Sequence, residues 1–411
     1  MSTDFREIEG GSVTSPDGFT AAGAAAGLKT NGALDVGLLV SSHSCATAGV
    51  FTKNVVKAAP VLYDQELLAE RPGRVRAVGV NARVANACTG APGLEAARAM
   101  ARATEDAAGL PPRTALVLST GVIGVPLPVD AVTGGLKDAA ARLSADGGHE
   151  LAAAIMTTDT KPKTCAVRFD TQGPRPITVA GVAKGAGMIH PDMATLLAVL
   201  TTDAVAEPAA LAPLLRRVAD RSFNAVSIDG DTSTNDTVLL LANGASGIDP
   251  SRDGAMWKTF EDAVLHVART LALAVVRDGE GATKLLEIQV VGAATEQAAR
   301  EVGRAIARST LVKTAVYGAD PNWGRVLAAA GAAGVALPVD KLRLEAQVDN
   351  GWLPLAIGGA TAHANPATAR AVFQQEHIIL RLDLGIGRGE SVVWTCDLTP
   401  EYVRINADYT S

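Results

Sequence analysis

The sequence predicts an α/β protein, because short runs of β-branched and apolar residues alternate along the chain with longer, alanine-rich amphipathic stretches. Residues 114–119 read as a strand, and residues 93–108 read as a helix that ends at the turn signals Gly109 and Pro111. The chain has 411 residues, of which 48% are hydrophobic, so it can bury one large core or two. We therefore expect helices to cover sheets whose inner faces are buried.

The same two patterns place further elements in chain order. In the first part of the chain, strands are expected at 177–182 and 237–242 and helices at 130–144, 207–223 and 255–276. After Lys284 the alternation restarts, with strands expected at 285–291, 342–348, 377–382 and 392–396 and a helix at 296–309. Internal repeats, low-complexity tracts and long linkers are absent from the sequence, so we expect a second, smaller α/β subdomain that packs tightly on the first.

Composition and charge argue against several classes of function. Aromatic residues make up only 4% of the chain and the formal net charge is −6, so a surface that attracts and stacks nucleic-acid bases is not expected. No stretch reaches the about 18 apolar residues of a membrane span, and the polar first residues do not resemble a signal peptide, which predicts a cytoplasmic protein. The four cysteines form no CxxC pair and the six histidines show no metal-ligand spacing, so we expect no disulfide, metal or other cofactor.

The strongest chemical signal is a glycine-rich approach to Thr195, which an apolar run follows. A threonine hydroxyl is unreactive near neutral pH, and one base that can activate it is the threonine's own free α-amine. Cutting the bond between Ala194 and Thr195 would free that amine, and the flexible backbone at Gly185 and Gly187 would let the hydroxyl attack the Ala194 carbonyl. The plainer interpretation is a strand that enters a core after a loop, with Thr195 as one of its β-branched residues.

A second chemical signal follows the predicted strand at 114–119. Thr120 and Gly121 lie in a glycine-bracketed turn, where backbone N–H groups and a hydroxyl could point into a site and stabilise an oxyanion. An ordinary strand-ending turn has the same composition, so both interpretations stay open.

Other polar segments are candidates for sites or for loops. The run TTDT at 157–160 follows an alanine-rich helix, and the segment at 277–284 places Glu280 where it could face a cationic amine or simply end a helix in solvent. The run DPNWGR at 320–325 fits a ligand clamp or a structural corner. The run DGDTSTND at 229–236 lacks the glycine and the glutamate of a calcium loop, so we expect a tight acidic turn held by bonds from side chains to the backbone. No glycine pattern of a dinucleotide-binding fold follows a strand.

Taken together, these segments resemble the ornithine acetyltransferase family, the glutamate N-acetyltransferases of arginine biosynthesis, over essentially the whole chain. The motifs that carry the resemblance are GFTAAG at 18–23, STGVIG at 119–124, TTDT at 157–160, KGAGM at 184–188, PDMAT at 191–195, DGEGATK at 278–284, LVKTA at 311–315, DPNWGR at 320–325 and YVRINADYTS at 402–411. One stretch departs from the family pattern: it commonly reads Asn-Ser-Gly-Asn-Ala-Asn-Ala, and here residues 81–87 read NARVANA, which puts the local loop geometry in doubt.

The resemblance implies a layered αββα sandwich, of the kind shared with the N-terminal-nucleophile aminopeptidases. It also implies self-cleavage between Ala194 and Thr195 into an α chain, 1–194, and a β chain, 195–411, which pair into an α2β2 heterotetramer. Within the β chain, residues 195–284 would complete the sandwich and residues 285–411 would form the C-terminal subdomain. The implied catalytic residues are Thr195 as nucleophile and Thr120 and Gly121 as oxyanion donors. The implied substrate contacts are Thr157, Lys184, Thr195, Glu280, Asn406 and Ser411.

The reaction implied is a ping-pong transfer, in which Thr195 takes the acetyl group of N2-acetyl-L-ornithine and passes it to L-glutamate. Acetyl-CoA could load the same ester, and the motifs do not separate the monofunctional from the bifunctional case. We suggest Lys184 as the partner of the substrate's α-carboxylate and Glu280 as the partner of ornithine's side-chain ammonium. The alternatives are an N-terminal-nucleophile aminopeptidase or amidase that passes the acyl group to water, and an uncleaved protein that binds the same ligands without chemistry.

Overall fold

The computed structural model describes residues 5–171, 173, 175–190 and 196–408 and contains two sheets with helices on their faces. The strands of the larger sheet are β1 (Arg6–Glu7), β2 (Phe19–Ala24), β3 (Val36–Phe51), β4 (Val75–Asn81), β5 (Ala115–Ser119), β6 (Lys163–Phe169), β7 (Ile177–Lys184), β8 (Leu197–Thr202) and β10 (Thr237–Ala242). The helices of the same part are α1 (Ala59–Glu70), α2 (Gly90–Ala107), α3 (Val129–Ala140), α4 (Gly148–Ala154), α5 (Pro208–Asp220) and α6 (Gly254–Arg277). The α/β class expected from the sequence is therefore confirmed.

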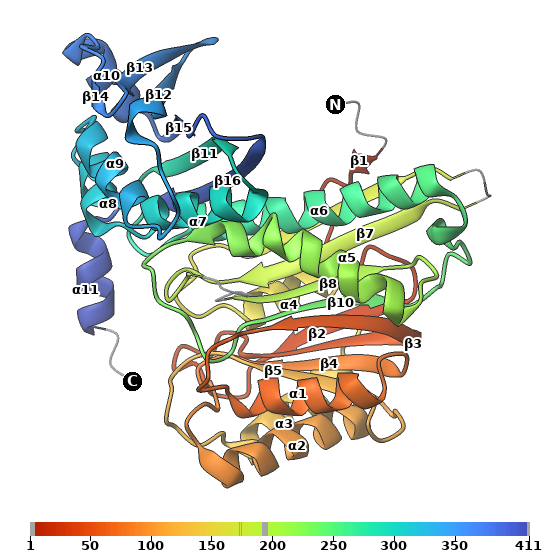
Figure 1. Cartoon of the computed structure of the whole chain (residues 1–411). Helices are drawn as coiled ribbons and strands as arrows, with labels where there is room; N and C mark the ends of the chain where they lie inside the picture. Colours follow the sequence, from red (N-terminus) through yellow and green to blue (C-terminus); the bar gives the residue numbers. More distant parts are fainter. Residues whose placement is uncertain (1–4, 172, 174, 191–195, 409–411) are drawn as a thin grey trace.

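The larger sheet folds into two layers that share the long strand β3. The first part of β3 pairs with β2 and β4, and its end pairs with β10, which leads on through β8 and β7 to β6 and β1. Side chains of β10 alternate between two cores: Val238 and Leu240 pack with α5 and α6, whereas Leu239 and Leu241 pack between the two layers of strands. A further core joins α2 and α3 to the outer face of β2 to β5. The order is thus helix, strand, strand, helix, as Figure 1 shows, and the expected αββα sandwich is confirmed.

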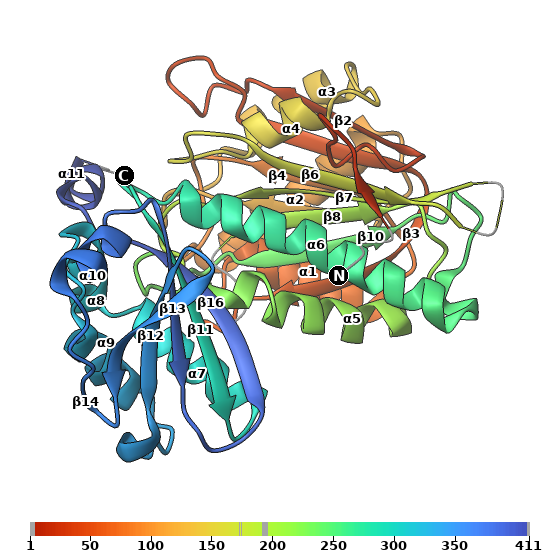
Figure 2. The ribbon, with the colours of Figure 1, turned by 90° about the horizontal axis from the view of Figure 1, so that it is seen from above.

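The second sheet contains all six strands that the structure describes after residue 284, together with β9. Its order is β14 (Ala360–Thr361), β13 (Gly351–Ile357), β12 (Arg343–Val348), β15 (His377–Asp383), β11 (Leu285–Ala293), β16 (Gly389–Cys396) and β9 (Val226–Ser227). Its helices are α7 (Glu296–Ala307), α8 (Thr310–Tyr317), α9 (Trp323–Gly331) and α10 (Pro366–Phe373), and α11 (Pro400–Asp408) follows the last strand. Figures 1 and 2 both place this sheet beside the sandwich, near the C-terminal end of α6. Because β9 comes from the first part of the chain, the two units are joined by more than the segment around Lys284.

Two expected helices end three or more residues earlier than the sequence suggests. The helix expected at 130–144 ends at Ala140, because Ser144 forms a bridge with Ala21 of β2 instead of continuing the helix. The helix expected at 207–223 ends at Asp220, and Phe223 begins a short 3-10 turn (Phe223–Ala225) that places its ring in the core. In both cases a tertiary contact ends a pattern that would otherwise continue.

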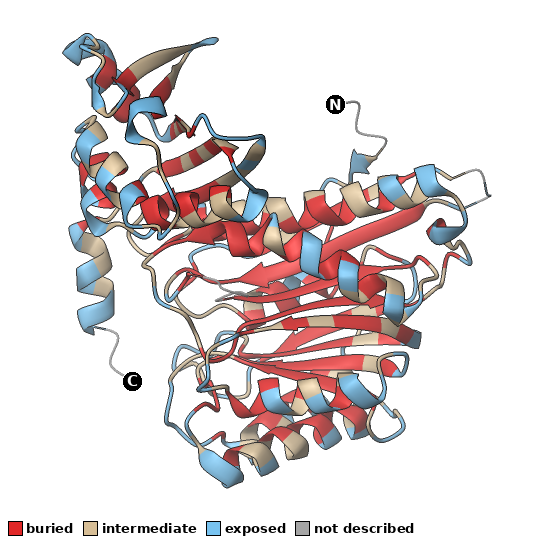
Figure 3. Cartoon of the chain, in the orientation of Figure 1, coloured by how far each residue is buried: buried red, intermediate tan, exposed pale blue. Residues whose placement is uncertain are grey.

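The central strands of the sandwich are buried over their whole length. Every residue of β7, β8 and β10 is buried, and Figure 3 shows these strands in red beneath partly exposed helices. None of the helices in the described part of the chain is long and apolar enough to cross a membrane. Because β7, β8 and β10 are buried over their whole length, polar groups at the ends of these strands are held by a rigid, close-packed interior.

Candidate active site

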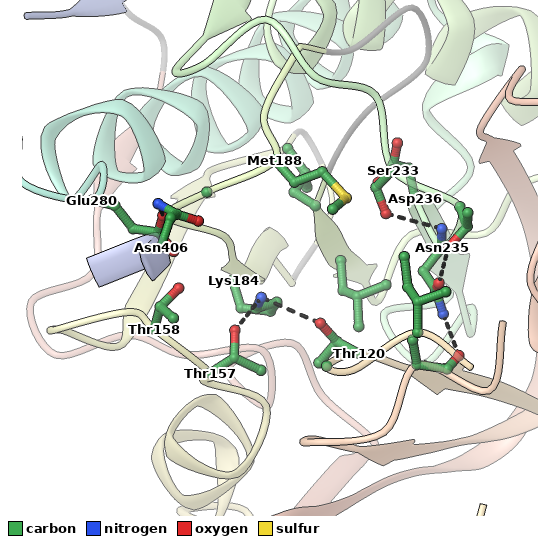
Figure 4. A pocket seen from close by; sticks show the side chains of 17 residues that line it. Thr120, Thr157, Thr158, Lys184, Met188, Ser233, Asn235, Asp236, Glu280 and Asn406 are labelled. Atoms are coloured by element: carbon green, nitrogen blue, oxygen red, sulfur yellow. Dashed lines mark hydrogen bonds between the residues drawn. The ribbon is translucent and has the colours of Figure 1, made fainter. Parts of the chain in front are cut away.

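A polar cavity opens where several strands and loops of the sandwich end. Its wall combines the turn after β5, the end of β7, the start of β8, the loop before β10, the turn after α6 and one residue of α11. The polar side chains around it, drawn in Figure 4, are those of Thr120, Thr157, Thr158, Lys184, Ser233, Thr234, Asn235, Asp236, Glu280 and Asn406. Segments that are far apart in the sequence thus meet around one small volume.

Six of the residues singled out in the sequence line this cavity: Thr120, Gly121, Thr157, Lys184, Glu280 and Asn406. Their proximity makes a shared site possible, and the individual roles stay predictions. The expected nucleophile Thr195, its neighbour Ala194 and the expected contact Ser411 lie outside the described residues. The plainer interpretation expected a strand that enters a core after a loop, and that strand is β8, which starts two residues after Thr195.

Lys184 is the last residue of β7 and lies at the centre of the cavity wall. Its Nζ donates hydrogen bonds to Thr157 Oγ1 at 2.7 Å and to Thr120 Oγ1 at 3.3 Å, and it lies 3.8 Å from Asp159 Oδ2. Burial lowers the pKa of Lys184, and the nearby carboxylate of Asp159 opposes that shift. The lysine therefore joins the turn after β5 to the loop at 157–160 and presents a buried cation to a ligand (Figure 4).

The turn after β5 is shaped by the loop on which it rests. Gly121 has a φ of 134°, and a Cβ there would lie 2.1 Å from the carbonyl carbon of Arg83, so only glycine fits this position. The amide of Thr120 donates to Asn81 O at 3.1 Å, and the amide of Val122 donates to Arg83 O at 3.0 Å. The amide of Thr120 is thus already used, and Thr120 would offer an oxyanion its hydroxyl, while Gly121 would offer its amide.

The loop at 81–87, whose geometry the unusual sequence put in doubt, is held by side-chain amides. Asn81 Oδ1 accepts a hydrogen bond from Ser119 Oγ at 2.6 Å, and Asn81 Nδ2 donates to Val84 O at 2.9 Å. Asn235 Nδ2 donates to Ala85 O at 2.6 Å and to Ser119 O at 2.8 Å. These bonds fasten the loop to the turn after β5 and to the acidic turn before β10.

Asn235 belongs to a stretch that sequence reasoning did not assign to the site. The acidic turn at 229–236 is held by bonds from side chains to the backbone, as expected: Asp229 Oδ1 accepts from the amides of Asp231 and Ile189. The end of this turn, residues 233–236, forms one side of the cavity. The signal that could have identified it is the density of short polar residues directly before the apolar strand β10.

Glu280 lies on the opposite side of the cavity from Asn235, in the turn after α6 (Figure 4). Its Oε2 accepts a hydrogen bond from Asn406 Nδ2 of α11 at 2.7 Å, and its amide donates to Ala186 O at 2.8 Å. A Cβ at Gly187 would lie 2.4 Å from Glu280 Oε2, so glycine at 187 permits this close approach. Glu280 therefore lines the cavity, and its role as a substrate contact stays a prediction.

The segment at 320–325 does not reach the cavity. Asn322 caps α9 by accepting a hydrogen bond from the amide of Arg325, and Arg325 NH1 donates to Leu311 O at 2.9 Å. These bonds fit the structural corner, the second of the two interpretations of this segment. Within the described ranges, no group of three or more His, Cys, Asp or Glu side chains is placed to hold a metal ion.

The fold and the cavity define the class: an α/β sandwich protein with a small polar site that offers a buried ammonium, two carboxylates and several hydroxyls. The ArgJ family model matches residues 20–411, and the chain belongs to the ArgJ family. The resemblance drawn from the motifs is therefore confirmed.

The relatives of this chain match it along its length. It is 48% identical over 97% of its residues to the arginine biosynthesis bifunctional protein ArgJ of Symbiobacterium thermophilum, covering 98% of that protein. It is 46% identical over 96% of its residues to the protein of the same name from Thermotoga neapolitana, covering 99% of it. A crystal structure of ornithine acetyltransferase from Mycobacterium tuberculosis, complexed with ornithine, is 42% identical, covers 47% of this chain and 100% of its own, and has a TM-score of 0.42.

Proposed function

We propose that this chain is the glutamate N-acetyltransferase of arginine biosynthesis, which moves an acetyl group from N2-acetyl-L-ornithine to L-glutamate. The observation that carries the proposal is the convergence of Thr120, Thr157, Lys184, Glu280 and Asn406 on one cavity in a chain of the ArgJ family. The cavity offers the cation of Lys184 and the carboxylates of Glu280 and Asp236, and each substrate brings an α-carboxylate, to which ornithine adds a side-chain ammonium.

The proposed nucleophile is Thr195, exposed as a new N-terminus by cleavage after Ala194. Its free amine, with an ordinary pKa of about 8, takes the hydroxyl proton while the oxygen attacks the acetyl carbonyl. The Thr120 hydroxyl and the Gly121 amide stabilise the oxyanion, and the tetrahedral intermediate collapses to the acetyl ester as ornithine leaves with the proton. The α-amine of glutamate then attacks the ester and restores the Thr195 hydroxyl.

Lys184 is proposed to bind the α-carboxylate that both amino acids carry. Its Nζ donates to the hydroxyls of Thr157 and Thr120, and a bound carboxylate can accept hydrogen bonds from the same ammonium group. Glu280 is proposed to bind the side-chain ammonium of ornithine, and Asn406 holds the Glu280 carboxylate in place by a hydrogen bond. Ser411, at the end of the chain, is proposed as a further substrate contact.

The ester could also be loaded from acetyl-CoA, which the word bifunctional in the relatives' names favours. The competing function is an amidase that passes the acetyl group to water. Efficient transfer needs a site that excludes water, because water would otherwise hydrolyse the ester before glutamate reaches it.

The proposal includes an assembly and a location. The α chain, 1–194, and the β chain, 195–411, stay together and pair into α2β2, and the β chain contributes residues 195–284 to the sandwich and 285–411 to the second unit. The enzyme works in the cytoplasm and needs no metal or other cofactor.

The first test is intact mass and N-terminal sequencing of the purified protein, where two fragments are expected, the second starting at Thr195. The cleaved protein is then incubated with acetylornithine, with and without glutamate. Acetylglutamate that appears only with glutamate supports the transferase, whereas acetate in both reactions identifies an amidase. A Thr195→Ala variant should stay uncut and inactive, and a cut or active variant would remove Thr195 from the mechanism.

A further inference from the structure

Behind the cavity wall lies a row of buried charges that the proposed mechanism does not use. Lys163 Nζ lies 2.7 Å from Asp159 Oδ1 and 2.6 Å from Asp278 Oδ2. The side chains of Lys163 and Asp159 are 2% and 0% exposed, so this ion pair is shielded from water and salt on all sides. Among the described residues that line the cavity, neither of them occurs. Any effect of Lys163 and Asp159 on the cavity therefore acts through the residues that they hold.

Asp159 holds the two segments that carry the polar wall of the cavity. Its Oδ2 accepts a hydrogen bond from the amide of Thr157 at 3.0 Å, and its Oδ1 accepts from the amide of Gly185 at 2.6 Å. The same carboxylate lies 3.8 Å from Lys184 Nζ. One buried side chain thus fixes the backbone on both sides of the bond between Lys184 Nζ and Thr157 Oγ1.

Lys163 extends this arrangement to the turn after α6. Asp278, its second partner, also accepts hydrogen bonds from the Thr160 amide at 3.0 Å and from the Thr160 hydroxyl. Glu280, one of the two carboxylates that line the cavity, follows Asp278 by two residues. The row from Asp159 through Lys163 to Asp278 therefore connects Lys184 with the turn that carries Glu280.

The row also sets the charge environment of Lys184. Burial disfavours the ammonium form and lowers the pKa of Lys184, and the charge of Lys163 lowers it further. The carboxylates of Asp159, Glu280 and Asp236 oppose this shift. Burial raises the pKa of Asp159, but Lys184 and Lys163 outweigh burial, so that Asp159 stays ionised and its pKa lies below the usual range.

We propose that Asp159 and Lys163 are positioning residues that act as a pair: Asp159 holds Lys184 in place as an ammonium, and Lys163 holds Asp159 and moderates its charge. Under the proposed function, this pair determines how well the site binds the substrate's carboxylate. Because the two residues carry opposite charges, they shift the pKa of Lys184 in opposite directions. A merely structural pair would have effects of the same sign.

The test compares Asp159→Asn, Lys163→Met and a control in the full-length, self-cleaved protein. Asparagine keeps the shape of aspartate but removes its charge. The control is Asp262→Asn, because Asp262 also pairs with a lysine four residues away, Lys258, but on the exposed face of α6. The first readout is the pH dependence of kcat/KM for acetylornithine. The second is the pH dependence with which acetic anhydride labels Lys184, measured by peptide mass spectrometry, which needs no acetyl transfer by the enzyme.

The alkaline midpoint in both readouts should move to lower pH in Asp159→Asn and to higher pH in Lys163→Met, and should stay in place in Asp262→Asn. A shift of one pH unit corresponds to about a tenfold change in kcat/KM above the midpoint. Unchanged midpoints, or midpoints that move in the same direction, would overturn the proposal. If Lys163→Met does not fold, the proposal is tested by Asp159→Asn and Asp262→Asn alone, and the alkaline midpoint should fall only in Asp159→Asn. If the wild type labels as expected but transfers no acetyl group, the proposed function fails and the pairing is still decided by the labelling.

Discussion

Lys184 of the sandwich and Lys313 of the second unit are both buried, but their side chains have different partners. Lys184, in the sandwich, donates to two hydroxyls on a cavity wall. Lys313 of α8 is 1% exposed and donates to the carbonyl oxygens of Cys396 and Asp397 and to Thr395 Oγ1 at 3.2 Å. Main-chain carbonyls at the end of β16 cannot leave their places, whereas hydroxyls on a cavity wall can give way to a ligand. Burial of a charged group therefore does not by itself mark a functional site. The partners of the group determine whether a ligand can replace them.

The two sheets also differ in how many of their faces are packed. In the sandwich, β10 contributes side chains to a core on each of its faces. In the second sheet, β15 alternates between buried and partly exposed residues, so that only one face is packed by helices. We expect the sandwich to tolerate less change, because a strand packed on both faces cannot relax toward solvent.

The largest effect is expected from Leu240→Ala in β10, which should lower the free energy of unfolding by about 4 kcal/mol. Leu355→Ala in β13, near the edge of the second sheet, should lower it by about 2 kcal/mol, because the cavity left there can partly collapse. Both leucines are buried in the wild type, at 0% and 3% exposure. Urea unfolding in an uncut Thr195→Ala background measures both values, and equal losses would contradict the difference between the two sheets.

Thr120→Val should leave the fold intact and lower kcat by about a hundred- to a thousandfold, because it removes a hydroxyl proposed to stabilise the oxyanion. Valine keeps the shape of threonine, and the control Thr259→Val changes a threonine on the exposed part of α6. Steady-state kinetics with acetylornithine and glutamate give the answer. A change confined to KM would assign Thr120 to substrate binding instead.

The two lysines should respond differently to the same substitution. Lys184→Met should lower kcat/KM by about 10- to 100-fold, the value of a hydrogen bond to a charged group, and change the free energy of unfolding by less than about 1 kcal/mol. Lys313→Met should lower the free energy of unfolding by about 2 kcal/mol, because it leaves buried carbonyl oxygens without a donor. Kinetics and urea unfolding of both variants test the contrast. Similar stability losses in the two variants would show that Lys184 is structural too.

The smallest effect is a pH dependence. Lysine is a cation below its pKa, and burial lowers the pKa of Lys184 from its ordinary value, so kcat/KM should fall as the pH rises through this lowered value. In Lys184→Arg, where the guanidinium stays charged over this range, the alkaline fall should disappear even if the activity itself is lower. The pH profiles of wild type and variant are the measurement, and an alkaline fall that survives in Lys184→Arg belongs to another group.

Several elements of the fold could be predicted from the sequence because their patterns are local. The strand expected at 237–242 is β10 without change, and the helix expected at 255–276 differs from α6 by one residue at each end. The long strand β3 was not foreseen, because the polar run from Ser41 to Ser44 interrupts its apolar pattern, and in the structure the pairing with β4 shifts register there. A strand that keeps its pairing across a polar interruption depends on its neighbours.

The α/β class, the family and six cavity residues follow from the sequence alone, because motifs and periodicity are written in short stretches of chain. Which distant residues meet depends instead on the tertiary fold: Thr120 and Lys184 are 64 positions apart, and Glu280 and Asn406 are 126 apart. The contributions of Asn235 and Asp159 arise in the same way, since each bonds to segments from other parts of the chain. The physical reason is that periodicity reports which face of an element is buried, whereas the partners of a buried polar group are chosen by packing across the whole fold.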